Sequence, residues 1–245
     1  MFYKYFFSLI LLFITFNSTA HAKNVCNRTL HVRNEIVRIT KKSCNEITDQ
    51  DLAKVTVLSL RSSSYQEGDF EGLSSLKWLS INNSYLSSLP EGIFKGLSSL
   101  MRLDLNDNQL RSLPEGIFNG LISLGMIDLS NNKLRNLPKG IFNGLSSLEE
   151  LYLSDNKLMS LPDGIFNDLS SLIWLSVSKN ELITLPEGIF NGLSFLEELS
   201  LNENHLKDLS EEVFDGLSSL KRLYLSDNKL RNLPKGIFNG LNTLV

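Results

Sequence analysis

The 245-residue chain has few of the residues from which catalytic and metal sites are usually formed. It contains three histidines and two cysteines, with no CxxC pair, so no metal site of the common zinc spacing is expected. Its serines recur at fixed intervals rather than beside a base, and no glycine-rich loop follows a strand in phosphate-binding order. We therefore expect no catalytic residues, no metal and no cofactor.

An excess of charge of one sign is also lacking. The sequence has 24 basic and 27 acidic residues, which gives a net charge of −3 at pH 7. Such weak acidity provides no electrostatic reason to expect nucleic acid or an anionic membrane as a partner.

Long apolar runs are absent except near the N-terminus. There Lys4, the mostly apolar residues 6–16, and the small residues Ala20 and Ala22 follow the order of a secretory signal peptide. The run is too short to span a bilayer, and the alternative, a buried N-terminal helix, would not explain this order. We expect cleavage after Ala22 and an exported mature chain, which would be secreted, periplasmic or at the cell surface. No membrane span would remain after signal removal.

The only two cysteines, Cys26 and Cys44, follow this segment. An exported chain meets an oxidising compartment, where an even pair of cysteines favours a disulfide. A metal site or a reactive thiol is the alternative, but His31 is the only histidine near the pair in the mature chain. We predict a Cys26–Cys44 disulfide, which would stabilise the fold by about 3 kcal/mol.

A repeat of 24 residues occupies most of the chain. Leucine recurs at Leu76 and then every 24 residues up to Leu244, and the segment NKLRNLPKGIFNGL occurs twice, 96 positions apart. Seven units of 24 residues follow a first unit of 21 residues, so eight units precede the start of a ninth. We therefore divide the chain into a signal peptide (1–22), an N-terminal cap (23–54) and a repeat domain (55–245).

The less common residues fall into columns of this repeat. All six prolines occupy one position, and a phenylalanine column is unbroken from Phe70 to Phe238. Each unit follows LxxLxLxxNxLxxLPxGIFxGLxx, in which the two leucines of LxL point the same way if the segment is a strand. Stacked units would then share a parallel sheet and a core of leucine and phenylalanine. The asparagine amides would bond backbone groups that the turn leaves unpaired.

At these positions the chain resembles the leucine-rich repeat family, in the 24-residue form found in extracellular receptors and matrix proteins. The resemblance covers residues 55–245. It implies an α/β-type solenoid, a right-handed curved coil with a parallel β-sheet on its concave face and irregular or 3-10 turns on its convex face. Eight strands about 4.8 Å apart would make a sheet on the order of 35–40 Å long.

The segment before the repeats is expected to cap the stack with short helices. Val32, Ile36 and Ile39 would share one apolar face of a helix, together with Val37. Thr48 favours a second helical turn, because threonine is a good N-cap residue, as is the aspartate after it. Around VCNRTLHVRNEIVRI this segment resembles the caps of exported bacterial leucine-rich repeat proteins.

At the other end the printed sequence stops just after the ninth unit begins, with Phe238 and Leu241 expected near an uncovered end. An open stack exposes its core there unless something covers it. The final unit would fray, pack on a partner, or continue into further repeats of a longer protein.

The repeats differ from one another mainly at two outward strand positions. Aromatic, methionine and arginine side chains recur there, and these types are enriched in protein interfaces. Tyr152, Trp174 and Met126 fall on consecutive units, where they would form a patch. We predict a non-catalytic binding face for a protein or a surface glycan, with these ligand-binding residues: Trp78, Arg102, Asp104, Met126, Asp128, Glu150, Tyr152, Trp174, Glu198, Arg222 and Tyr224. With ten acidic and six basic residues at or beside these positions, the face disfavours a polyanion.

Two alternatives to a specific binding face remain. The first is an architectural or truncated repeat module, on whose surface any side chain is tolerated. The second is a glycan-active enzyme, in which Glu150 and Glu198 flank Trp174 with backbones about 10 Å apart, near the carboxylate separation of inverting glycosidases. An open sheet, however, has no cleft that excludes water or raises the pKa of an acid.

Overall fold

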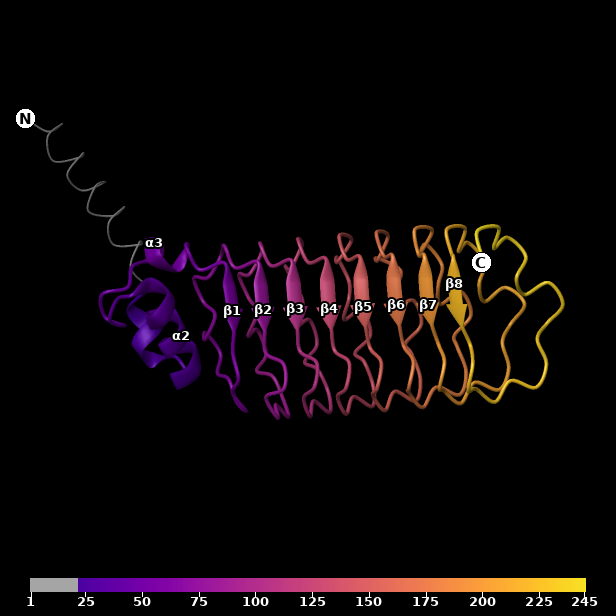
Figure 1. Cartoon of the computed structure of the whole chain (residues 1–245), viewed down its shortest axis with the longest axis horizontal. Helices are drawn as coiled ribbons and strands as arrows, with labels where there is room; N and C mark the ends of the chain where they lie inside the picture. Colours follow the sequence, from indigo (N-terminus) through magenta and orange to yellow (C-terminus); the bar gives the residue numbers. More distant parts are fainter. Residues whose placement is uncertain (1–21) are drawn as a thin grey trace, which may run out of the picture.

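The computed structural model describes residues 22–245, with side chains from residue 24 onward. The predicted signal peptide, residues 1–22, therefore lies outside the described residues except for Ala22. Eight strands of three residues follow one another along the chain, and all are parallel in the sheet order β1 to β8 (Figure 1). Their bounds are Val57–Ser59 (β1), Trp78–Ser80 (β2), Arg102–Asp104 (β3), Met126–Asp128 (β4), Glu150–Tyr152 (β5), Trp174–Ser176 (β6), Glu198–Ser200 (β7) and Arg222–Tyr224 (β8).

Each coil of the chain meets the next at equivalent positions of the repeat. Leu103, for example, pairs in register with Leu79 on one side and Ile127 on the other. All three side chains are fully buried, because strand alternation turns them away from solvent. The predicted leucine-rich repeat solenoid, with its parallel sheet along one side, is thus confirmed.

The return half of each coil fills the other side of the core with phenylalanine. The rings from Phe70 to Phe238 stack on one another with centroids 6.1–6.4 Å apart. The turn before each ring requires a positive φ at positions such as Gly116, where φ is 64° and an added Cβ would lie 2.5 Å from Nδ2 of Asn119. Glycine is needed there, because a side chain would be strained and would collide.

The asparagine column closes the turn after each strand, as the sequence predicts. Nδ2 of Asn108 donates to the carbonyl oxygens of Ile81 and Leu105 at 2.7 and 3.0 Å. Its Oδ1 accepts from the backbone N–H groups of Ser84 and Leu86 at 3.1 and 3.0 Å. A buried amide therefore pairs backbone groups of its own coil and of the coil before it, which locks neighbouring turns together.

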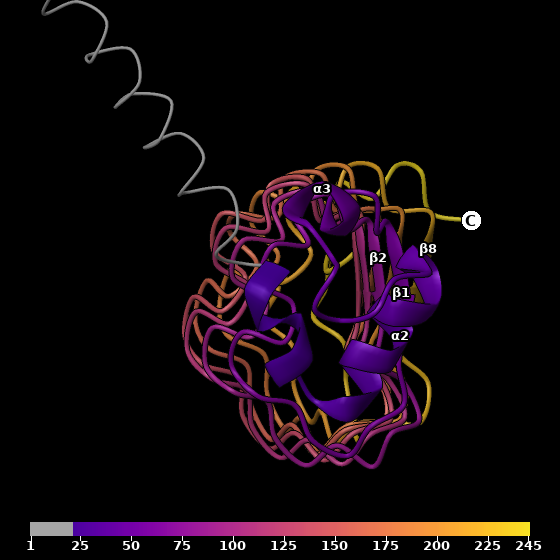
Figure 2. The ribbon, with the colours of Figure 1, turned by 90° about the vertical axis from the view of Figure 1, so that its left-hand side faces the viewer.

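The N-terminal segment covers the first coil with helices, as expected. It contains the 3-10 helix η1 (Ala22–Asn27) and the α-helices α2 (Leu30–Thr40) and α3 (Asp49–Leu52), which lie across the end of the stack in Figure 2. Val32 and Ile36 of α2 are fully buried, while Val37 and Ile39 are partly buried against the core. Thr48 is the N-cap of α3, and its side chain and that of Asp51 form a capping box.

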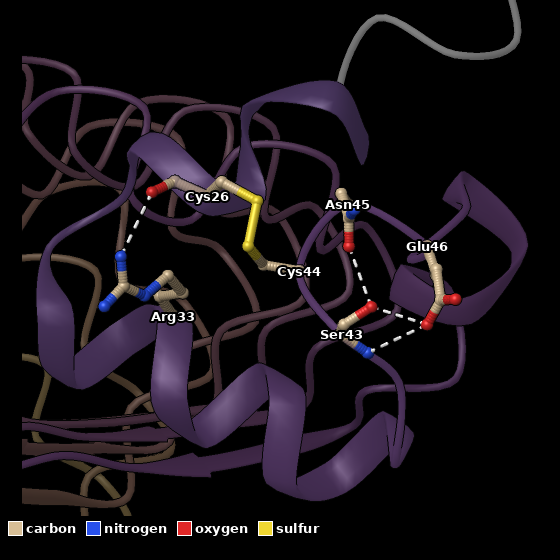
Figure 3. Close-up of a disulfide and its surroundings, with 6 residues drawn as sticks. All are labelled: Cys26, Arg33, Ser43, Cys44, Asn45 and Glu46. Carbon is tan, nitrogen blue, oxygen red and sulfur yellow. Dashed lines mark hydrogen bonds between the residues drawn. A yellow bond between two sulfur atoms is a disulfide. The ribbon is translucent and has the colours of Figure 1, made fainter.

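The predicted disulfide between Cys26 and Cys44 is present, with a Cα–Cα distance of 5.1 Å. It joins η1 to the loop that follows α2 (Figure 3). Arg33 of α2 supports this junction by donating a hydrogen bond of 3.4 Å to the Cys26 carbonyl oxygen. The bridge thus ties together the pieces of the cap that precede and follow its longest helix.

A buried polar cluster joins the cap to the first coil. The Arg28 guanidinium donates to the carbonyl oxygens of Asp69, at 3.1 Å, and Glu71. Oδ1 of Asp69 accepts from the backbone N–H of Thr29 at 2.7 Å, and Oδ2 accepts from the N–H of Gln66 at 2.8 Å. Asp69 has no exposed surface, and burial lowers the pKa of Arg28 to about 10 by disfavouring its charged form. The contact links residues 40 positions apart and was not predicted from the sequence.

The last coil is the least buried part of the repeats. Phe238 is 43% exposed, whereas the ring before it, Phe214, is 1% exposed. Leu241 keeps only 8% of its surface exposed.

No helix among residues 22–245 is both long enough and apolar enough to cross a membrane.

Candidate binding face

The outward side chains of the eight strands and the residues beside them form one continuous surface, which we call the sheet face. Register pairing carries one outward column through Trp78, Arg102, Met126, Glu150, Trp174, Glu198 and Arg222 on successive strands, and a second through Asp104, Asp128, Tyr152 and Tyr224. The strand order therefore brings together the residues that the sequence analysis selected.

One group on the sheet face consists of Trp78, Arg102 and Asp104. The indole Nε1 of Trp78 donates to Oδ2 of Asp104 at 2.7 Å, and Nε of Arg102 donates to Oδ1 at 2.9 Å. The Arg102 guanidinium also lies 5.1 Å from the centroid of the Trp78 ring, within cation–π range. Asp104 is consequently only 4% exposed although it points outward, so its carboxylate is largely covered by its neighbours.

A second group joins β7 and β8. Nε of Arg222 donates to Oε2 of Glu198, and Lys221 pairs with Glu197 at 2.7 Å. The hydrogen bond and charge of Glu198 raise the pKa of Arg222. Glu198 is 4% exposed, so this predicted ligand-binding carboxylate is also covered by a partner within the chain.

The middle of the sheet face differs from both of these groups. The Tyr152 hydroxyl donates to Oε2 of Glu150 at 2.8 Å, and the Tyr152 ring lies 6.2 Å from the Trp174 ring in a tilted contact. Met126, Asp128, Tyr152 and Trp174 are partly exposed, and Glu150 is exposed. The predicted patch on consecutive coils therefore exists, and none of its aromatic rings is in the core.

Two titratable groups of this patch lie in an unfavourable environment for negative charge. Burial raises the pKa of Asp128, and the negative charges of Asp104 and Asp107 add to this, although hydrogen bonds from Ser130 oppose it. The pKa of Tyr152 is raised well above its usual value by burial, by its hydrogen bond to Glu150 and by the charges of Glu150 and Asp128, although the charge of Arg102 opposes this. The centre of the sheet face therefore carries a local excess of negative charge.

The ion pairs divide the charges of the sheet face unevenly. Four of its ten acids pair with four of its six bases, in Arg102–Asp104, Lys179–Glu203, Lys221–Glu197 and Arg222–Glu198. Among the described residues this leaves six carboxylates without an ion pair, against two cations, Arg61 and Lys77. The six carboxylates are Asp107, Asp128, Glu149, Glu150, Asp155 and Asp227, of which five lie in the coils of β3 to β5.

Gly125, directly before β4, is a feature of the sheet face that the sequence analysis did not select. It is the one glycine outside the two glycine columns of the return turns, and this was the available signal. Its φ is not in the left-handed region, and an added Cβ would meet only the Met101 carbonyl oxygen, at 3.6 Å. Neither backbone conformation nor packing therefore requires glycine here.

The arrangement gives little support to the enzyme alternative. Trp174 does lie between Glu150 and Glu198 in the register, as expected. Glu198, however, is held by Arg222, and Glu150 accepts from Tyr152 on an open surface. Two surface hollows lie elsewhere, one beside α3 and the first return turns around Gly72 and Gly96, the other around His31 and Tyr85. No cluster of three or more residues suited to a metal occurs among residues 22–245.

Comparison with known proteins gives a consistent picture of the repeats. The family model described as leucine rich repeat matches residues 74–134, 98–158, 124–182, 147–206 and 195–245. No curated protein sequence matches the chain.

Solved structures similar to the chain come from an animal and from bacteria. The Toll–Spätzle complex of Drosophila has 30% identity and a TM-score of 0.72, over 80% of this chain and 27% of that chain. A leucine-rich repeat protein of Leptospira interrogans has 34% identity and a TM-score of 0.71, over 79% of this chain and 48% of that one. Internalin C2 of Listeria monocytogenes, at 21% identity and a TM-score of 0.72, covers 93% of this chain and 95% of its own, and shares the fold. The chain thus spans less than half of the first two proteins.

Proposed function

Because the chain belongs to the leucine-rich repeat family, we propose that it is a non-catalytic binding module that recognises a protein or a surface glycan through its sheet face. One of the similar structures is a complex of Toll with Spätzle, so a solenoid of this kind holds a protein partner in that case. We further propose that the chain is exported, which is consistent with its disulfide and with the signal peptide predicted for residues 1–22.

The observation that carries the binding proposal is the contact between Tyr152 and Trp174. Two large rings lie against each other outside the core, on the surface where the repeats differ most from one another. The leucines of the same strands already fill the core, so the rings are not needed to bury the sheet. Partly exposed tyrosine and tryptophan are the side chains that contribute most to protein interfaces.

The test compares the mature chain, residues 23–245, with a Tyr152→Ser/Trp174→Ser double variant and with Tyr85→Ser as a control. Tyr85 is 72% exposed and lies outside the strands, so its variant removes an exposed aromatic ring away from Tyr152 and Trp174. Each protein is screened against a glycan array and a displayed peptide library, and its thermal unfolding temperature is measured.

We expect the double variant to lose ligands that the parent and Tyr85→Ser both capture, with no drop in unfolding temperature. If no ligand is captured, or if the double variant captures the same ligands as the parent, the sheet face is not the binding site. The architectural alternative would then hold.

A further inference from the structure

We propose that the centre of the sheet face, formed by β4, β5 and β6, binds a basic side chain from an extended segment of a partner protein. The lysine or arginine head group would lie against Tyr152 and Trp174 and face Asp128 and Glu150, with the partner backbone passing over Gly125. This inference depends on the proposed function and narrows it, because it commits to a protein partner and to the charge of the group that is recognised.

The chain contains its own example of such a site. Arg102 lies over the Trp78 ring at 5.1 Å while its Nε donates to Asp104 at 2.9 Å. The centre of the sheet face offers the same two components, aromatic rings and outward carboxylates. Trp174 occupies the strand position of Trp78 four coils further along, and Asp128 occupies that of Asp104 on the next coil. Trp174 pairs in register with Glu150, as Trp78 pairs with Arg102. What the central patch does not contain is the cation.

The charges around the patch favour a cationic group from outside. Asp128 and Glu150 have no ion pair among the described residues, and their polar partners are Ser130 and Tyr152. Among the bases of the sheet face, the nearest without an ion pair is Lys77, which precedes β2 and is therefore two strands from β4 and three from β5, about 10 and 15 Å at the strand spacing. The Arg102 charge is already taken by Asp104, and those of Lys221 and Arg222 by Glu197 and Glu198. A basic group of a partner would therefore meet little competition from the basic side chains of the sheet face itself.

The environment of the carboxylates also favours binding of a positively charged group. Burial and neighbouring carboxylates raise the pKa of Asp128, so its ionised form is costly in the unbound protein. Burial, the hydrogen bond to Glu150 and the charges of Glu150 and Asp128 raise the pKa of Tyr152. A cation placed between these groups would relieve repulsion that the chain itself leaves in place.

Gly125 provides room for the partner beside these groups. It lies between Met101 and Glu149 in the column before the strands, and both of these side chains are exposed. Without a side chain at Gly125, the surface beside Met126 is low, so a partner backbone can approach the sheet closely. Because glycine is not needed for the fold at this position, a substitution can block the approach without damaging the structure.

The experiment measures binding of two blocked peptides to the mature chain. One peptide carries arginines separated by glycine and serine, and the other carries citrulline in their place, which keeps the shape but removes the charge. Trp78→Phe leaves Trp174 as the single tryptophan, so its fluorescence reports on the patch. The variants tested in this background are Gly125→Met, Asp128→Asn/Glu150→Gln and, as a control, Glu187→Gln, an exposed carboxylate on a return segment.

We expect the arginine peptide to bind at least tenfold more tightly than the citrulline peptide. Gly125→Met and Asp128→Asn/Glu150→Gln should each weaken binding at least tenfold without lowering the unfolding temperature, whereas Glu187→Gln should change it less than twofold. Equal binding of the two peptides, or equal losses in Glu187→Gln and in the patch variants, would overturn the inference.

Failure of this inference and failure of the proposed function give different results. A neutral glycan or peptide that binds in a manner sensitive to Tyr152 and Trp174, but not to the charge of Glu150, would contradict recognition of a basic group and leave the binding face intact. If the proposed binding face is itself wrong, the screens will find no ligand whose binding is weakened by the Tyr152→Ser/Trp174→Ser variant.

Discussion

The side-chain Oδ1 of Asn132 accepts a hydrogen bond of 3.0 Å from the backbone N–H of Leu110, which lies 22 residues earlier on the preceding coil. Nδ2 of the same amide donates to the carbonyl oxygens of Leu105 and Leu129 at 3.0 and 3.1 Å. One buried side chain therefore satisfies three backbone groups, and it does so on two coils. The equivalent asparagines repeat this bond along the stack, so neighbouring coils are joined by side chains as well as by the sheet.

Replacing Asn132 with alanine should destabilise the middle of the solenoid by about 2–4 kcal/mol, because three buried backbone groups lose their partner. Asn228 makes equivalent bonds in the last coil, where it is only partly buried, so water can replace its amide. Asn228→Ala should therefore lower the free energy of unfolding by clearly less than Asn132→Ala. Urea unfolding followed by circular dichroism measures both variants, and equal costs would contradict this explanation of the asparagine column.

Phe142→Ala should lower the free energy of unfolding by about 3–5 kcal/mol, because the ring is fully buried and stacked on both sides. Phe238 belongs to the same column but is 43% exposed and, among residues 22–245, stacks on one ring, that of Phe214. Its alanine variant should cost about 1 kcal/mol. Denaturant unfolding of the two variants provides the comparison, and a cost at Phe238 as large as at Phe142 would show that the last coil is better packed than its exposure indicates.

Asp51 should make the cap sensitive to acid. Hydrogen bonds from Lys42 and then Thr48 hold the pKa of Asp51 well below its usual range. A carboxyl whose pKa falls on folding contributes stability above the unfolded pKa of about 4, and this contribution is lost as the pH falls below that value. Asp51→Asn should therefore lower the unfolding temperature at pH 7, and the difference from the parent should shrink toward pH 2. Asp163→Asn, at an exposed carboxylate of a return segment, is the control and should show no such trend.

Asp128 should have the opposite effect on stability. Burial and nearby carboxylates raise its pKa, so the folded state binds the proton more tightly and ionisation costs stability as the pH rises above about 4. Asp128→Asn should then raise the unfolding temperature at pH 7 and bring no gain near pH 3. Thermal unfolding across this pH range is the measurement. A variant that is less stable than the parent at pH 7 would mean that the bonds from Ser130 outweigh the cost of the charge.

Most of the fold was predictable because core side chains pack against the equivalent side chains of the neighbouring coils. The spacing of Leu79, Leu103 and Ile127 gives the register of three strands directly, and the phenylalanine column gives the stacked rings. The cap was predictable in parts: the helix with Val32 and Ile36, the turn after Thr48 and the disulfide are all present. The docking of Arg28 on Asp69 was not predictable, because it joins two segments with different sequence patterns.

The candidate site was predictable as a surface, but the state of its charges was not. The sequence placed Asp104 and Glu198 in the outward columns among the exposed ligand-binding residues, and both are covered by their neighbours. The covering groups, Trp78 and Arg222, come from adjacent strands, and long side chains can reach several partners there. Gly125 was not selected because candidate site residues were chosen by the chemistry of their side chains, and glycine has no side chain.

The repeat period by itself determined the solenoid, the inward and outward positions, and the buried asparagine column, because a 24-residue spacing places each side chain beside its equivalents in the neighbouring coils. Only the tertiary structure decided which outward charges neutralise one another. Arg102 and Arg222 could each have extended into solvent, and their ion pairs with Asp104 and Glu198 depend on side-chain rotamers and strand spacing that no pattern of residues specifies. Those pairs leave the carboxylates of β4 and β5 without a cation.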